Sequence, residues 1–359
     1  VSLGKPIRGA RRGEAIGMRS RVFDTTTIPT GTADLKDFVC SPLHSGPGSV
    51  VRCFIERNRS GTHTLSHTFS MYADLEDGSG RLLLAARKLL ASKTAYFIVC
   101  LRQDDLFRDS GKRGGNSFLG KLRASSTSHT EYSLYDGGDN PATAAADKMG
   151  DSDCEAEEKI SVRPTDGNSS SKGYNKEGNA LRKELGVIVY NFDKKDQRTG
   201  KRRMEVAIPQ LLHKGDRWEP VVWQPNDTKE SIRVHFGRTR YKGAQNHLQE
   251  DRLLIMHQRE SRYDPLSSCL VDFRGRATAP SVKNFQLIKS CPEDNLKRAR
   301  YFSEGAGKDD TESDDVPRPV WLQMGKVGKE CFNVDVEWPL SLLQAFAICL
   351  SRFDTNAHF

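Results

Sequence analysis

The sequence lacks any apolar run long enough to cross a membrane as a helix, since such a span needs about 20 apolar residues. Hydrophobic residues are also scarce, at 36% of 359 residues, which predicts an ordinary core diluted by long polar stretches. The sequence opens without the pattern of a signal peptide. These absences predict a soluble, intracellular protein of one large or two ordinary domains.

Cysteine pairs at metal-binding spacing are absent as well. The eight cysteines form no CxxC pair, and no histidine is spaced to complete a zinc site. Cys100 ends an apolar run and Cys349 lies within another, so both are expected to be small buried hydrophobes with reduced thiols. The sequence therefore predicts neither a disulfide framework nor a metal cofactor.

Catalytic motifs are missing too: there is no GxSxG, no HExxH, and no pair of carboxylates in an apolar setting. Gly115–Lys121 (GNSFLGK) superficially matches a phosphate loop, but Leu122 stands where Ser or Thr should bind the metal, and strand-like sequence follows instead of a helix. His63 and His67 share a helix face only if that segment is helical, whereas its alternation favours a strand. We therefore expect no enzyme activity and no cofactor.

Positive charge, in contrast, is plentiful. The formal net charge is +8, and the acidic residues are unevenly placed, with two runs at Asp147–Glu158 and Asp309–Asp315. The remainder is distinctly basic, which favours an anionic partner: phosphate groups, nucleic acid or an acidic membrane surface. Net charge alone does not choose among them.

The most apolar segment is Pro339–Asp354 (PLSLLQAFAICLSRFD), whose hydrophobic side chains cover every direction of a helical turn. Such a helix must be surrounded by protein or lipid, and it is too short to span a bilayer. It is predicted to fill the middle of a folded domain.

The rest of the ordered sequence reads as short strands separated by turn signals. Strands are expected at 49–57, 64–75, 81–88, 94–102, 118–124, 130–135, 186–192, 203–208, 268–273, 284–288, 320–327 and 331–336, with 210–262 left ambiguous. About a dozen strands around an apolar helix predict a mainly β protein: a closed antiparallel β-barrel enclosing a central hydrophobic C-terminal α-helix. Residues 1–33 are expected to form a disordered basic arm, and 34–359 the barrel domain with disordered insertions at about 137–178 and 292–318.

Lys121, Leu122 and Arg123 form the most suggestive charge pattern. On a strand, side chains alternate with a period of two, so both cations face one side about 6 to 7 Å apart and could clamp two neighbouring phosphates. A solvated outer face of a barrel strand would give the same pattern. Further positive charge lies nearby at Arg87, Lys88 and Lys93, and these residues are predicted to belong to the same anion-binding site. Basic hairpin tips for solubility are the plainer interpretation of the pattern. The four tryptophans do not interleave with basic residues as a base-stacking surface would.

A series of motifs resembles the tubby-like protein family over the stretch from Leu35 to Asp354. The motifs are LLLAARK (82–88), SKT (92–94), FLGKLR (118–123), YDG (135–137), RKEL (182–185), RGRA (274–277), SVKNFQ (281–286) and LQAFAICLS (343–351). SVKNFQ with the following Leu287, and LQAFAICLS, are long enough to be specific.

This resemblance implies the tubby C-terminal domain, a closed barrel around a hydrophobic helix that binds phosphatidylinositol 4,5-bisphosphate at the inner membrane leaflet. The headgroup clamp of that family falls on Lys121, Arg123 and Arg182 here. Two features depart from the family pattern: Ala95 replaces an Asn after the SKT motif, and a dense basic run is thinned to Arg87 and Lys88. Weaker membrane affinity is expected, by roughly 1 kcal/mol per lost basic residue.

The resulting hypothesis is a non-enzymatic, phosphoinositide-binding adaptor or signalling protein, expected as a monomer at the cytoplasmic face of the plasma membrane and in the cytosol. The nucleus and the cilium are further locations, with protein cargo or transport partners. The alternative is a nuclear DNA-binding transcription regulator, favoured by the net charge of +8 and the basic arm. Lipid scrambling by a related barrel would need a long apolar or acylated anchor, which is not seen.

Overall fold

A computed structural model describes residues 21–43, 46, 48–58, 67–89, 92, 94–107, 117–139, 181–192, 202–225, 228–242, 252–259, 272–290 and 318–354. The two expected insertions lie outside these residues, apart from residues 137–139 and Arg318. Lys93, His63, residues 1–20 of the expected basic arm, and residues 268–271 of one expected strand also lie outside them.

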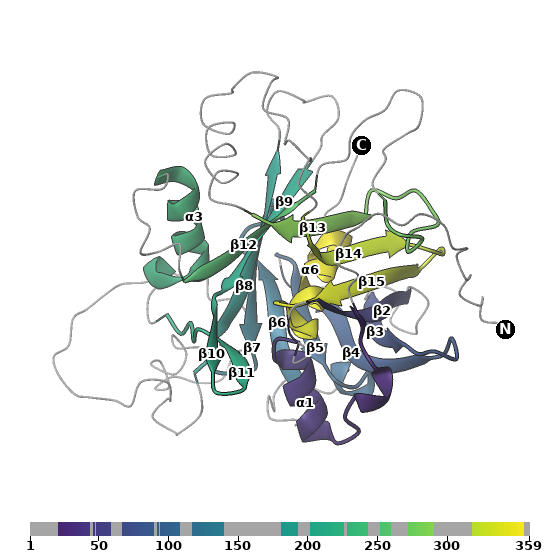
Figure 1. The fold of residues 1–359 in the computed structure, drawn as a ribbon. Helices are drawn as coiled ribbons and strands as arrows, with labels where there is room; N and C mark the ends of the chain where they lie inside the picture. Colours follow the sequence, from purple (N-terminus) through teal and green to yellow (C-terminus); the bar gives the residue numbers. More distant parts are fainter. Residues whose placement is uncertain are drawn as a thin grey trace.

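Most of the described strands form one sheet that closes on itself (Figure 1). Each of twelve strands pairs antiparallel with its neighbours in the order β2-β15-β14-β13-β12-β9-β8-β7-β6-β5-β4-β3, and β3 pairs with β2 to close the barrel. Their bounds are β2 (Ser49–Asn58), β3 (Thr68–Asp74), β4 (Gly80–Leu89), β5 (Tyr96–Cys100), β6 (Phe118–Ala124), β7 (Glu131–Asp136), β8 (Glu184–Phe192), β9 (Arg202–Pro209), β12 (Leu253–Gln258), β13 (Phe285–Lys289), β14 (Val320–Lys326) and β15 (Cys331–Glu337). Closure leaves none of the twelve with an unpaired side, as predicted from the strand count.

The barrel interior is filled by helix α6 (Leu342–Asp354), of which every residue except Arg352 is buried. Inward side chains of the strands, such as Leu84, Phe97 and Leu122, join α6 in one core cluster. Fully burying a side chain the size of Leu or Phe contributes about 1.5 to 3 kcal/mol, so α6 is a major source of stability. The expected barrel around a C-terminal helix is confirmed, and the helix begins at Leu342 rather than at Pro339.

A capping box explains where α6 begins. The backbone N–H of Gln344 donates to the Ser341 hydroxyl at 3.1 Å, and the backbone N–H of Ser341 donates to the Gln344 amide oxygen at 3.0 Å. This reciprocal pair satisfies two backbone donors that a helix start leaves without partners. The Gln344 amide nitrogen also donates to the Leu185 carbonyl at 2.9 Å, which ties the start of the helix to β8.

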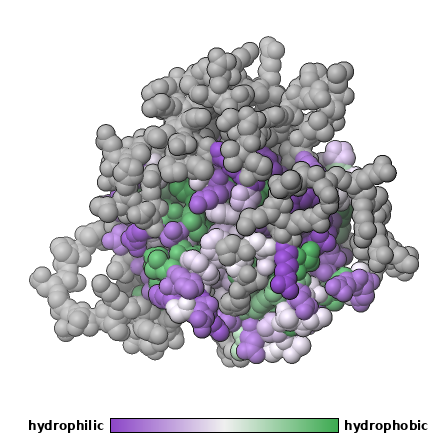
Figure 2. All heavy atoms as spheres, viewed as in Figure 1, coloured by the Kyte–Doolittle hydropathy of each residue, from purple (hydrophilic) through white to green (hydrophobic). Residues whose placement is uncertain are grey.

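Additional elements cover the outside of the barrel. Helix α3 (Ile232–Lys242), preceded by the short helix η3 (Thr228–Glu230), packs on β8 and β9 and forms a second core. That core contains Val187, Val189, Ala207, Trp223, Ile232, Phe236, Leu253 and Ile255. A separate two-stranded hairpin consists of β10 (Leu211–Lys214) and β11 (Arg217–Pro220). On the face drawn in Figure 2, hydrophobic and hydrophilic residues lie interspersed over the described surface.

Residues 21–33 are ordered, which corrects the expectation of a disordered arm over 1–33 for this part. β1 (Arg21–Val22) pairs in parallel with β2, η1 (Thr25–Thr27) follows, and α1 begins at Thr32 and ends at Cys40. Apolar anchors give the physical reason: Ile28 is buried, and the Phe23 ring lies 5.6 Å from that of Phe38 in α1. A few spaced apolar residues provide this anchoring without any periodic pattern.

Eleven of the twelve expected strands are present, with ends shifted by up to four residues. Asp272 and Phe273, at the end of the twelfth, belong to no strand. β12, α3 and the β10–β11 hairpin lie in the stretch left ambiguous.

The thiols of Cys53, Cys100 and Cys349 are free and buried, as expected for Cys100 and Cys349. No helix among the described residues is both long and apolar enough to cross a bilayer.

Candidate functional site

Lys121 and Arg123 lie on the outer face of β6, because Leu122 between them is fully buried in the barrel core. Lys121 stands opposite Ile98 of β5 and Tyr135 of β7, while Arg123 stands opposite Tyr96 and Ser133. The Arg123 guanidinium lies 5.5 Å from the centre of the Tyr96 ring. The two cations therefore share one wall of the barrel, in the arrangement that the period of two predicts.

Gly120 keeps β6 and β7 close at this wall. A Cβ at this position would lie 2.2 Å from the carbonyl oxygen of Tyr135, a distance that no side chain can adopt without moving the backbone. A larger residue would therefore separate the strand that carries Lys121 from the one that carries Tyr135. The glycine is a structural requirement of the GKLR sequence.

Arg182 reaches the same wall from the segment that leads into β8. Its guanidinium stacks on the Tyr135 ring at 4.3 Å from the centre, and its backbone N–H donates to the Asp139 carbonyl at 2.8 Å. Gly138 permits this approach, because a Cβ there would lie 2.6 Å from the backbone of Arg182. Arg182 thus lies over the ring of the residue that stands opposite Lys121 in the sheet.

The charges of Arg123 and Arg182 act on the Tyr135 phenol. Burial, followed by the negative charge of Glu184, raises the pKa of the Tyr135 phenol, and the positive charges of Arg182 and Arg123 act in the opposite direction. Both guanidinium groups are therefore near enough to influence the phenol. Among the described residues, Arg123 and Arg182 have no carboxylate within ion-pair distance. We call Lys121, Arg123 and Arg182, grouped around Tyr135, the cationic clamp.

Arg87 extends this wall. It stands opposite Ile98 of β5, which in turn stands opposite Lys121, so Arg87, Ile98, Lys121 and Tyr135 form one row across four strands. Burial lowers the pKa of the Arg87 guanidinium, whose Nε atom is buried without a hydrogen-bond partner among the described residues. The Arg87 guanidinium lies over the Phe107 ring at 4.8 Å.

Lys88 points to the other side of β4, away from the cationic clamp. It stands opposite the core residue Phe97, and its ammonium lies 2.6 Å from the Asp354 carboxylate at the end of α6. The expectation that Lys88 joins Arg87 in one anion site therefore does not fit this geometry, because neighbouring residues on a strand face opposite sides. Lys93 lies outside the described residues.

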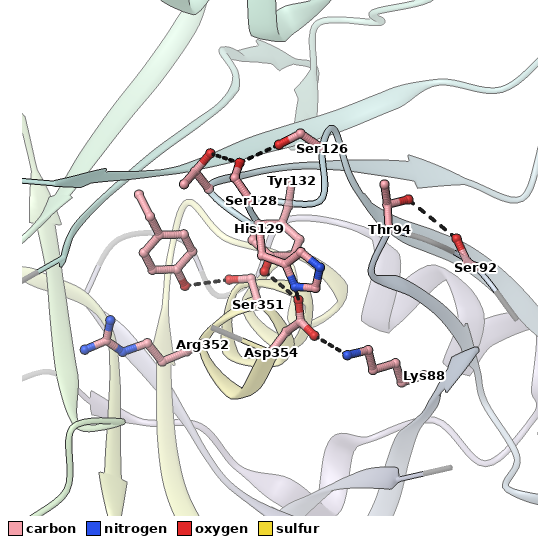
Figure 3. Close-up of polar contacts among 12 residues, drawn as sticks. Lys88, Ser92, Thr94, Ser126, Ser128, His129, Tyr132, Ser351, Arg352 and Asp354 are labelled. Carbon is pink, nitrogen blue, oxygen red and sulfur yellow. Dashed lines mark hydrogen bonds and ion pairs between the residues drawn. The ribbon is translucent and has the colours of Figure 1, made fainter. Parts of the chain in front are cut away.

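Lys88 belongs instead to a polar group around the buried Asp354 carboxylate, the Asp354 cluster, which also contains His129, Tyr132, Tyr190 and Ser351 (Figure 3). Asp354 Oδ2 lies 2.8 Å from His129 Nδ1 and accepts a hydrogen bond from the Tyr132 hydroxyl at 2.6 Å. The Tyr190 and Ser351 hydroxyls lie 2.9 Å apart. Sequence reasoning missed this cluster; the only signal was an acidic residue at the end of an otherwise apolar helical segment.

Further hydroxyl groups lie near the Asp354 cluster in Figure 3. In the β6–β7 turn, the Ser126 and Ser128 hydroxyls lie 2.6 Å apart and those of Ser128 and Thr130 lie 3.0 Å apart. In the β4–β5 connection, Ser92 and Thr94 make a longer contact of 3.5 Å. Across the residues that the structure describes, no three His, Cys, Asp or Glu side chains gather into a metal site.

Comparison with known proteins gives consistent matches. A family model described as the Tub family matches residues 40–355. The chain is 29% identical over 353 residues to Tubby-like F-box protein 11 of Arabidopsis thaliana, with 95% of this chain and 79% of that protein covered. It is 29% identical to Tubby-related protein 2 of Mus musculus (86% and 43% covered) and 30% identical to Tubby-related protein 3 of Homo sapiens (90% and 57% covered). The chain thus spans about half the length of these two animal relatives.

Proposed function

The chain belongs to the Tub family, and on that premise we propose that it is a non-enzymatic protein that binds phosphatidylinositol 4,5-bisphosphate through its cationic clamp. The proposed location is the cytoplasmic face of the plasma membrane, where this lipid would hold the protein reversibly. Family membership confirms the resemblance seen in the sequence motifs. The lipid, the location and the adaptor or signalling role are the proposal.

One observation carries the proposal: two cations of β6 and a third from the segment before β8 lie on one outer wall, and Arg123 and Arg182 have no carboxylate partner among the described residues. Like charges repel, so a fold that brings them together is consistent with a bound polyanion. Guanidinium groups bind phosphate oxygens in a bidentate manner, and a lysine adds a strong point charge. An inositol ring with two neighbouring phosphates fits this set of donors.

The rigid base of the cationic clamp supports the same function. Tyr135 stands directly opposite Lys121 in the sheet, and its ring is stacked under Arg182, so this ring supports one of the three cations and neighbours the strand position of a second. Side chains held in place before binding lose less conformational entropy when the ligand arrives. Arg87, in the same row, adds positive charge at the edge of the cationic clamp.

The test is sedimentation of the protein with vesicles of phosphatidylcholine, with or without phosphatidylinositol 4,5-bisphosphate. The double variant Lys121→Ala/Arg123→Ala is expected to bind about thirtyfold more weakly, because each cation near an anionic surface contributes about 1 kcal/mol. Lys289→Ala/Lys326→Ala is the matched control, since it removes the same charge from β13 and β14, far around the barrel. Equal losses in both variants would mean that only net charge matters and would contradict a specific site.

Duplex DNA is the second candidate ligand, because the net charge of +8 would also attract a nucleic-acid backbone. Strong salt dependence is expected for both ligands and does not separate them. Sequence-selective binding to duplex DNA at physiological salt, together with equal affinity for vesicles with and without the phosphoinositide, would favour the nuclear role.

A further inference from the structure

Phe107 is an exposed aromatic residue on a rigid base. It directly follows η2 (Asp104–Leu106), whose Leu106 is fully buried against Ala85 and Cys100 on the outside of the barrel. The connection is fixed on both sides: the backbone N–H of Leu101 donates to the Ser117 carbonyl at 2.9 Å, and the Ser117 hydroxyl donates to the Asp105 carboxylate. The Phe107 residue nevertheless remains 44% exposed.

The sheet register places Phe107 beside the cationic clamp. Three rows of outward side chains run across β4 and β5: Ala85 with Cys100, Arg87 with Ile98, and Leu89 with Tyr96. Leu106 covers the first row, whereas Ile98 and Tyr96 of the other two stand directly opposite Lys121 and Arg123. Phe107 lies over Arg87, at the boundary between the covered row and the cationic rows.

The Arg87 side chain lies beneath Phe107 and links it to the cationic clamp. Its guanidinium lies 4.8 Å from the ring centre, in cation–π range. Its Nε atom is buried and has no hydrogen-bond partner among the described residues. The pair therefore places an exposed apolar ring directly beside a partly exposed cation. This combination suits the boundary between lipid headgroups and acyl chains, where aromatic rings and basic side chains are enriched.

We propose that Phe107 inserts into the interfacial region of the bilayer when the cationic clamp holds its headgroup, with Arg87 at a neighbouring lipid phosphate. This inference rests on the proposed function, which places the cationic clamp against the membrane. A single weak membrane signal gives only marginal binding, so a second, apolar contact complements a phosphoinositide site. The neighbouring cations favour an anionic lipid surface over an acidic protein groove, because a protein partner would need both a ring pocket and several carboxylates.

The first arm of the test compares Phe107→Ser with Val282→Ser. Val282, which is 52% exposed and precedes β13, is the matched control for loss of exposed apolar surface. Phe107→Ser is expected to bind phosphoinositide vesicles roughly fivefold more weakly, since part of one aromatic side chain leaves the lipid. Both variants should bind soluble inositol 1,4,5-trisphosphate like the wild type, because that headgroup has no acyl chains. Phe107→Trp should keep the vesicle affinity, and its added fluorescence should shift to the blue and be quenched by lipids brominated on their acyl chains.

Three results overturn the inference. Wild-type vesicle affinity in Phe107→Ser would show that the ring stays out of the lipid. An equal loss of affinity for the soluble headgroup would show that Phe107 only supports the cationic clamp. Unquenched fluorescence of Phe107→Trp on bound vesicles would place the ring in water. If the wild type binds neither vesicles nor the soluble headgroup, the proposed function itself fails, and this inference fails with it.

Discussion

At the scale of single residues, Asp354 occupies an electrostatically unfavourable place, because a helix C-terminus repels negative charge. The carboxylate is buried there only because Lys88 and His129 lie within ion-pair distance and Tyr132 donates a hydrogen bond. These partners come from β4, β7 and the turn before β7. The Asp354 cluster therefore links the end of the central helix to the barrel wall.

Replacement of Asp354 by Asn is expected to lower the free energy of unfolding by about 2 to 3 kcal/mol. The change removes a charge while leaving the Lys88 ammonium in place, and the cost is moderated by the partial exposure of Lys88 and His129. Urea unfolding followed by circular dichroism measures the difference. Tyr132→Phe, which removes one hydrogen bond and keeps the ring, should lose only about 1 kcal/mol; a larger loss there than in Asp354→Asn would contradict the assignment.

Glu184, beside Arg182, predicts an effect of pH on stability. Burial raises the pKa of its carboxyl group, while the backbone N–H of Ile232, which donates to its Oε2 at 2.6 Å, acts in the opposite direction. A carboxyl group whose pKa is raised by folding binds more protons in the folded state. Its contribution to stability is therefore present at low pH and is lost as the pH rises through the folded pKa.

The variant Glu184→Gln should remove this loss, because its amide oxygen can still accept the hydrogen bond from Ile232. Relative to the wild type, the variant should gain stability between pH 4 and pH 7, measured as urea midpoints at both values. Glu219→Gln, on the exposed β10–β11 hairpin, is the control and should show no such trend. A difference between wild type and Glu184→Gln that is independent of pH would rule out this explanation.

At the scale of elements, the alternation of side chains between the two faces of a strand explains both what the sequence predicts and what it misses. It places Lys121 and Arg123 on one face correctly, and the same rule, applied to Arg87 and Lys88, separates two cations that composition alone groups together. β12 escaped prediction because both of its faces are covered, one by the barrel core and the other by the α3 core, so its sequence LLIMHQ does not alternate. Arg182 and Tyr135 meet across a connection that spacing cannot predict.

The start of α6 offers a test of an element boundary. Ser341→Ala removes the capping hydroxyl from the backbone N–H of Gln344 and should lower the free energy of unfolding by about 1 kcal/mol. Thermal unfolding should show a lower midpoint, whereas Ser126→Ala, at an exposed turn, should behave like the wild type. An unchanged midpoint for Ser341→Ala would mean that packing alone fixes the first turn.

At the scale of the whole molecule, the barrel and α6 depend on each other. A chain that ends after Glu337 would leave the inward side chains of twelve strands without their central packing partner. Removing about a dozen buried residues costs far more than the 5 to 15 kcal/mol of net stability that native proteins have. The shortened chain is therefore expected to lack a cooperative thermal transition. A folded shortened chain, seen as dispersed amide signals in NMR spectra, would show that the strands can collapse onto one another.

The barrel was predictable as a whole because its parts agree: short strands, turn signals and one helix that must be buried. The ordered segment from Arg21 to Ala33 was not, since Phe23 and Ile28 are isolated apolar residues that only tertiary contacts anchor. The Asp354 cluster was not predictable either, because Tyr132 and Asp354, which share a hydrogen bond, lie 222 residues apart along the chain, and Lys88 lies farther still from Asp354. Local patterns determine the elements, whereas the polar contacts between them depend on the closed fold.

Closure of the barrel also has a kinetic consequence. β2 near the beginning of the chain pairs with β15 near its end, as in the pairing of Glu56 with Cys331. Such long-range pairing requires an unfavourable loss of chain entropy on loop closure before its hydrogen bonds form, so it slows folding. Until β2 and β15 meet, both present open edges that can pair with other chains. The protein is therefore most prone to aggregate when it refolds at high protein concentration.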